Sequence, residues 1–150
     1  MSAAIIAILA GVAINGGFIN SEHDSLSRYL PQIAERARDA VTLRDLLRRT
    51  SGIETTSEEI RVTLKGHPLR TPLSGISIND DRYFHNANIN YHILRIALTE
   101  ICKKPLNKLI EDTLWKPLGL ENASIIATGY CCLFATARSL LKIGTLFLNQ

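Results

Sequence analysis

Two short stretches of this sequence combine residue types that could do chemistry at a useful spacing. Ser139 and Lys142 stand three positions apart, and on a helix this spacing lets the amine accept the proton of a nucleophilic hydroxyl. We interpret this single S-x-x-K as coincidental in a chain that contains serines and lysines. The second stretch, Asn86-Ala87-Asn88, offers amides that form hydrogen bonds but cannot act as general acids or bases near neutral pH.

The cysteines and histidines do not follow a pattern typical of a disulfide framework or a metal site. Cys102 stands alone, and Cys131 and Cys132 are adjacent, which rarely allows them to bridge each other. The histidines do not complete the paired ligand spacing of a metal site; they are His23, His67, His85 and His92. We therefore expect buried apolar thiols, no metal site and no cofactor.

Length and composition favour one globular domain with a real core. The chain has 150 residues, of which 46% are hydrophobic and 21% charged. A net charge of +3, scattered along the sequence, is too small to indicate nucleic-acid binding.

The opening apolar run, Ala3–Ile14, is shorter than the about 20 residues of a membrane span and lacks the cationic start of a signal peptide. We expect a buried core helix capped by Ser2 and stopped by Gly16-Gly17. We thus predict no membrane span, and the compartment stays unknown, with the cytoplasm as the default.

A second helix is predicted in the stretch VTLRDLLRRTSGI. Thr42 and Asp45 have the spacing of a capping box, and Gly52 is expected to end the helix. Between Glu54 and Asp81 we expect mostly loop, with one short helix near 57–64. The apolar face of the second helix is predicted to consist of Leu43, Leu46 and Leu47.

Three more helices are predicted towards the C-terminus: an amphipathic one that Asn88 could cap, one opened by Pro105, and one capped by Thr136 that runs to the end of the chain. The stretch ASIIAT is the best, though weak, strand signal. The expected inward residues are Ile89, Ile93, Ile96, Ala97 and Ile101 in the first of these helices, Leu106, Leu109, Ile110 and Leu114 in the second, and Leu140, Ile143 and Phe147 in the third.

Three stretches together resemble one enzyme family. They read LSRYLPQIAERARDAVTLRDLLRRTSGI, YFHNANINYHILRIALTEICKKPLNKLIEDTLWKPLGLENAS and GYCCLFATARSLLKIGTLFLNQ. In this order they are similar to segments of the β-lactamase-related serine hydrolases, which include class C β-lactamases, penicillin-binding proteins, related esterases and 6-aminohexanoate-dimer hydrolases. The matches cover most of residues 20–150, and AGVAINGGFINSEHDSLSRYL fits the family helix that carries the nucleophile motif at its N-terminal end.

The resemblance implies a mainly α structure: the helical portion of the α/β serine β-lactamase/transpeptidase-like fold, lacking most of the sheet, with residues 1–150 as a single partial domain. It also implies acyl transfer on small-molecule amides, esters or β-lactams. In that family the serine of S-x-x-K attacks a carbonyl and the lysine takes its proton. A tyrosine of Y-x-N assists, and a K-T-G-like strand helps to bind the oxyanion.

The family's catalytic motifs are not matched in this chain. Aligned on the opening helix, the lysine falls near Ala3, the nucleophile at or before Met1, and the K-T-G strand beyond Gln150. The Y-x-N motif falls on N-A-N, so Asn88 matches the amide and Asn86 replaces the tyrosine. We therefore assign no catalytic residue and predict Asn86 and Asn88 as substrate-binding. The alternatives are a helix cap for Asn88 and a cap or loop residue for Asn86.

These observations lead to one preferred function and two alternatives. We predict a truncated, catalytically inactive member of the family. One alternative is a helical interaction module that binds a protein partner or self-associates through apolar surface left uncovered. The other is one part of a split or misannotated serine hydrolase gene, for which an in-frame S-x-x-K upstream would be the discriminating feature.

Overall fold

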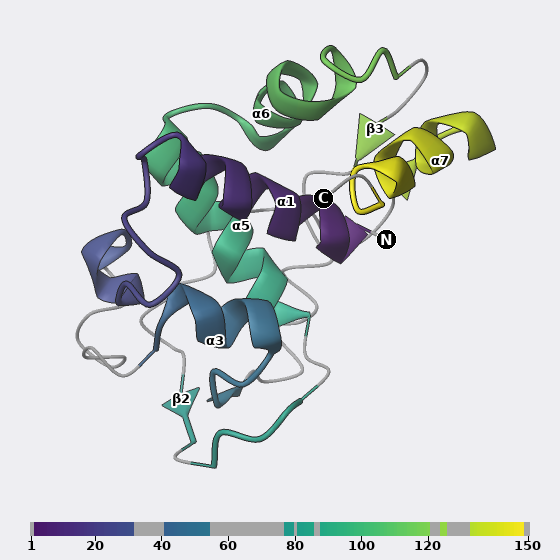
Figure 1. Cartoon of the computed structure of the whole chain (residues 1–150). Coiled ribbons are helices and arrows are strands. Elements are labelled where there is room, and N and C mark those ends of the chain that lie inside the picture. The colour runs from purple at the N-terminus through teal and green to yellow at the C-terminus, as the bar shows by residue number, and fades with distance from the viewer. Residues whose placement is uncertain are drawn as a thin grey trace.

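The computed structural model describes residues 2–31, 41–54, 77–79, 81–85, 88–120, 124–125 and 133–148. These residues form mainly helices, with two small antiparallel strand pairs (Figure 1). The predicted architecture, helical with little sheet, is confirmed. The helices are α1 (Ser2–Asn15), η1 (Leu26–Arg28), α3 (Leu43–Arg48), α5 (Ile89–Cys102), α6 (Leu106–Ile110), the π-helical η4 (Glu111–Trp115) and α7 (Ala137–Thr145).

Each strand is only two residues long. β1 (Ile53–Glu54) pairs with β2 (Ser77–Ile78), and β3 (Ser124–Ile125) pairs with β4 (Leu133–Phe134). β3 lies inside the ASIIAT stretch, so that weak strand prediction is confirmed. The helix expected near 57–64 falls outside the described residues.

The opening run forms α1, as predicted, and it ends where Gly17 adopts a positive φ of 74°. Ile5, Ile6 and Leu9 of α1 are fully buried, so this is a core helix. Ser2 is its first helical residue rather than a residue before it. The Ser2 hydroxyl accepts a hydrogen bond from the backbone N–H of Leu133 at 3.2 Å, which ties the start of α1 to β4.

α5 is the central helix of the molecule and packs against α1, α3 and α6 (Figure 1). Every residue from Ile89 to Leu98 is buried, including the polar Asn90, His92 and Arg95. The predicted helix and its inward residues Ile89, Ile93, Ile96 and Ala97 are confirmed, but the opposite side of this segment is buried too. Because neighbours cover α5 on several sides, its polar residues are enclosed rather than turned towards solvent.

The start of α3 follows the sequence pattern closely. The Thr42 hydroxyl accepts from the N–H of Asp45 at 3.2 Å, and the Asp45 carboxylate accepts from the N–H of Thr42 at 2.8 Å, which completes the predicted capping box. The end differs from the prediction, because Arg49, with a φ of 60°, terminates the helix. Gly52 instead has a φ of 69° and leads into β1.

α6, η4 and α7 form the other end of the molecule. Pro105 precedes α6, and the predicted inward residues of α6 and η4 are all buried. Thr136 caps α7 by accepting from the N–H of Ser139, as predicted. Ile143 is buried, but the predicted inward Phe147 is 56% exposed and lies beyond the end of α7. The inward prediction for Phe147 is wrong, because the chain leaves the helix at Thr145 and no longer follows its inner face.

Candidate functional site

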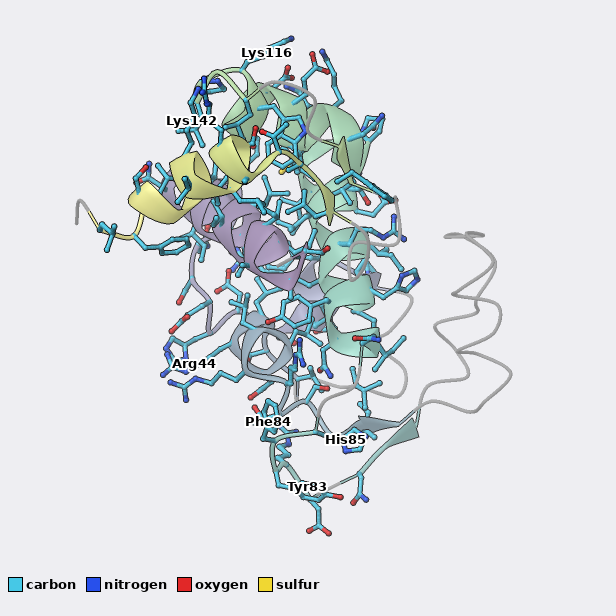
Figure 2. All side chains as sticks on the ribbon, turned by 90° about the vertical axis from the view of Figure 1, so that its right-hand side faces the viewer. Arg44, Tyr83, Phe84, His85, Lys116 and Lys142 are labelled. Carbon is cyan, nitrogen blue, oxygen red and sulfur yellow. The ribbon has the colours of Figure 1, made fainter. Side chains whose placement is uncertain are left out.

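The chain just before α5 carries an exposed aromatic stretch. Tyr83 and Phe84 are 64% and 65% exposed, and the rings of Tyr83 and His85 meet edge to face with centroids 6.5 Å apart. Figure 2 shows Tyr83, Phe84 and His85 together at the end of the molecule opposite Lys116 and Lys142. The N–H of His85 donates to the carbonyl of Arg49 at 3.0 Å, so this stretch is attached to the end of α3.

Asn88 follows this stretch and occupies the N-cap position of α5. Its side chain is exposed and makes no capping hydrogen bond, and its backbone is already helical. The capping role considered for the Asn88 side chain is therefore wrong. Only the Asn88 carbonyl contributes to the helix start, by accepting from the N–H of His92 at 3.1 Å. Asn86, the other predicted substrate-binding residue, lies outside the described residues.

Contacts from the end of α3 and the residues that follow it hold the start of α5 in place. The Ser51 hydroxyl donates to Oδ1 of Asn90 at 2.6 Å and accepts from the N–H of Ile53 at 3.2 Å. The Tyr91 hydroxyl donates to the carbonyl of Leu47 at 3.1 Å, and the Arg49 guanidinium lies 4.9 Å from the centre of the Tyr91 ring. The exposed Asn88 therefore lies next to residues of α5 that are held by contacts with Leu47, Arg49 and Ser51.

At the N-terminal end of α1 lies Ala3, near which the sequence resemblance predicts the family's lysine to align. Ala3 is half-buried and packs against the hydrophobic core. Its methyl group cannot accept or deliver a proton.

The S-x-x-K of α7 does not form a serine–lysine hydrogen bond in the described structure. Ser139 is buried, and its Oγ lies 3.1 Å from Thr136 Oγ1, which donates to it. The Nζ of Lys142 donates to the carbonyl of Gly119 at 2.8 Å (Figure 2). Each side chain therefore makes its own structural contact, which is what we expect if the motif is coincidental.

Among the described residues, no group of three or more histidine, cysteine or acidic side chains could hold a metal ion. Within the same residues, no helix is long and apolar enough to cross a membrane. Cys102 is half-buried, and burial raises the pKa of its thiol, opposed by the nearby Lys104. This thiol is therefore less reactive than an ordinary exposed cysteine. Cys131 and Cys132 lie outside the described residues.

One feature that the sequence reasoning missed is Arg95, in the middle of α5. Its side chain is 5% exposed, and burial lowers the pKa of its guanidinium. Within the described part of the chain, its Nε and Nη2 atoms have no hydrogen-bond partner. A buried arginine without an acceptor is unusual. An arginine inside a run of apolar residues was the only available signal, and that pattern alone does not distinguish burial from a solvated position.

Comparisons with known proteins agree with this architecture. A sequence model described as β-lactamase matches residues 4–130. Protein flp of Staphylococcus aureus strain NCTC 8325 / PS 47 is 27% identical over 118 residues, which are 72% of this chain and 24% of that protein. This chain thus spans about a quarter of the length of that curated relative.

Solved structures show the same fold at low sequence identity. A class C β-lactamase mutant superposes with a TM-score of 0.77 at 20% identity, over 95% of this chain and 47% of its own. The D-stereospecific amidohydrolase of a Streptomyces species gives a TM-score of 0.65 at 18% identity, over 83% of this chain and 42% of its own. Together with the family match over most of the sequence, these likenesses show that the chain belongs to the β-lactamase family.

Proposed function

We propose that this chain keeps the helical part of the β-lactamase fold without hydrolytic activity of its own. The observation that carries the proposal is Ala3, which stands on α1 where the family lysine aligns and packs into the core. Asn86 in place of the family's tyrosine supports it from the sequence. Removing one member of such a catalytic set already abolishes most of the rate, so two substitutions make acyl transfer by this chain ineffective.

The serines that could replace the nucleophile are occupied by structural contacts. Ser2 is buried, and its hydroxyl accepts from the Leu133 N–H. Ser139 is also buried and bonds with Thr136. Neither hydroxyl is presented on an open surface next to a base, which is what activation of a serine requires.

Asn88 remains our predicted ligand-contacting residue, together with Asn86. The exposed Asn88 amide can hydrogen-bond a carbonyl or an N–H of a small amide, ester or β-lactam. Binding without turnover is the expected behaviour of a family member that has lost its proton-transfer groups. The small-molecule class is proposed from the family membership.

The experiment that tests this proposal is intact-mass spectrometry of the folded protein after incubation with a fluorophosphonate and, separately, with a penicillin. We expect no covalent adduct with either reagent, with folding verified by circular dichroism. A stoichiometric adduct would overturn the proposal. Peptide mapping, with Ser2→Ala and Ser139→Ala as matched variants, would then identify the reactive serine.

A second candidate function is protein interaction through apolar surface. The observation that favours it is an open apolar groove along α1, lined in part by the exposed Phe147. This candidate is compatible with the first, because neither Ala3 nor Asn88 lines the groove.

A further inference from the structure

In the described parts of the chain, two residues other than glycine have a left-handed backbone, and each directly follows a helix. They are Arg49 after α3, with a φ of 60°, and Lys103 after α5, with a φ of 50°. A residue that carries a Cβ is strained in this conformation, so it persists where the surrounding contacts hold it. The contacts around these two residues are of different kinds.

Lys103 lies at the end of α5 that is remote from Asn88, about 20 Å away along the helix axis. Its side chain is 80% exposed, and its Nζ donates to Oε2 of Glu100 at 3.4 Å. This contact stays within the last turn of the same helix. The left-handed residue after α5 is therefore explained by the ordinary way in which helices end.

The backbone of Arg49 contacts the segment that leads to Asn88. The Arg49 carbonyl accepts a hydrogen bond from the N–H of His85 at 3.0 Å. A second attachment of this segment joins Nη1 of Arg82 to Oδ2 of Asp45 at 3.6 Å. The segment 82–85 is therefore fixed to α3 at two points, and it is fixed at Arg49 three residues before Asn88.

The side chain of Arg49 contacts the segment that follows Asn88. Its guanidinium lies 4.9 Å from the centre of the Tyr91 ring, within the range of a cation–π contact. Tyr91 comes three residues after Asn88, in the first turn of α5, and α3 lies beside this end of α5 (Figure 1). Arg49 thus contacts the chain on both sides of Asn88, at His85 through its carbonyl and at Tyr91 through its guanidinium.

We propose that Arg49 is a positioning residue for the ligand-contacting Asn88. The Asn88 side chain makes no capping hydrogen bond of its own, so the contacts of Arg49 on either side keep this residue in place. The strain of the left-handed backbone is retained because this conformation lets one residue reach both segments. The inference rests on the proposed function, in which Asn88 contacts the ligand.

Arg49→Gly tests this role, because it removes the guanidinium and also relieves the strained backbone. The midpoint of urea unfolding should therefore not fall, whereas Asn88 should become mobile. In ¹⁵N relaxation measurements, we expect the order parameter of the Asn88 backbone N–H to fall from about 0.85 to below about 0.6. The affinity for benzylpenicillin should fall about fivefold. Arg49→Lys keeps a cation over the Tyr91 ring, so it should retain the order of Asn88 and most of the affinity.

Lys103→Gly is the matched control, because it relieves the same kind of strain at the other end of α5. It should leave the order parameter of Asn88 and the affinity unchanged. The proposal is overturned if Asn88 is equally ordered in the wild type and in Arg49→Gly, or if Lys103→Gly mobilises Asn88 as much. A lower urea midpoint for Arg49→Gly, with no recovery in Arg49→Lys, would also overturn it by showing a merely structural role.

Failure of the proposed function gives a different result. A wild type that does not bind benzylpenicillin at about 10 mM would contradict ligand binding at Asn88. The role of Arg49 in holding Asn88 is then still decided by the order parameters, because they are measured without ligand.

Discussion

Two buried polar regions on either side of the α3–α5 contact differ in how their hydrogen-bonding groups are satisfied. In the corner between α3 and β1, the buried Ser51 hydroxyl bonds with Asn90 and with the Ile53 N–H, and at the other end of α3 the half-buried Thr42 and Asp45 bond with each other. One and a half turns further along α5, Arg95 is buried with two nitrogen atoms that have no acceptor among the described residues. The corner should therefore add to stability, and Arg95 should subtract from it.

The polar groups of the corner and the Arg95 guanidinium differ in where hydrogen-bond partners are available. Ser51, Thr42 and Asp45 find acceptors and donors close in sequence or on the facing start of α5. Arg95 is buried in the middle of α5, and its Nε and Nη2 have no such partner among the described residues.

The largest effect is expected for Gly52→Ala, which changes the corner itself. Gly52 has a φ of 69°, and a Cβ there would lie 2.2 Å from the backbone oxygen of Asn79. Because the obstacle is backbone, the corner must shift, and we expect a loss of about 3 kcal/mol or more in the free energy of unfolding. Urea denaturation measures it. As a control, Gly144→Ala, which meets nothing within 4 Å, should be neutral or stabilising.

Ser51→Ala should cost about 2 kcal/mol, because it leaves the buried Asn90 Oδ1 without its donor and the Ile53 N–H without its acceptor. The measurement is again the free energy of unfolding, with Thr145→Ala as an exposed hydroxyl control. A loss no greater than that of the control would mean that the corner is not held by this contact.

Arg95→Met should have the opposite sign. It replaces a buried guanidinium, two of whose nitrogens have no acceptor among the described residues, with an apolar chain of similar length, so we expect a gain of about 1–2 kcal/mol in the free energy of unfolding. Arg95→Lys keeps the charge and should give no such gain. If Arg95→Met destabilises the protein, Arg95 has a partner in solution and the contrast between the two regions disappears.

The smallest effect concerns Asp24, a half-buried carboxylate that is well paired. A hydrogen bond from the Tyr29 hydroxyl, with further help from backbone N–H groups and Arg28, holds the pKa of Asp24 below its usual value. Its contribution is therefore present above the unfolded pKa and is lost as the pH falls through the folded pKa. In urea titrations from about pH 6 to about pH 2, Asp24→Asn should lose less stability on acidification than the wild type. If the free energy of unfolding falls equally with pH in both proteins, the Tyr29 contact contributes nothing.

Local sequence patterns predicted much of the fold. Thr42, Pro105 and Thr136 mark helix starts because capping depends on residues within one turn of each other. The burial of Arg95 could not be predicted in the same way, because α5 packs against elements that are distant in sequence, such as α1 and α3.

At the candidate site, the sequence correctly predicted that Asn88 lies at the start of a helix. It did not predict that the Asn88 side chain makes no capping hydrogen bond. Capping geometry depends on the backbone angles of the preceding loop, which residue types alone do not specify. The contact between Ser51 and Asn90 joins residues 39 positions apart, so it could not be predicted from a local sequence pattern either.

The hydrogen bond between Ser2 and Leu133 has a consequence for synthesis on the ribosome. It joins residues 131 positions apart, so the start of α1 is synthesised long before its partner Leu133. At about 5–20 residues per second, that interval lasts on the order of 10 s. During it, the start of α1 lacks this partner, although α3 and α5 are already made before it ends, and it can meet chaperones and other nascent chains. The yield of folded protein in cells should therefore depend on translation speed and chaperone supply more than its final stability would suggest.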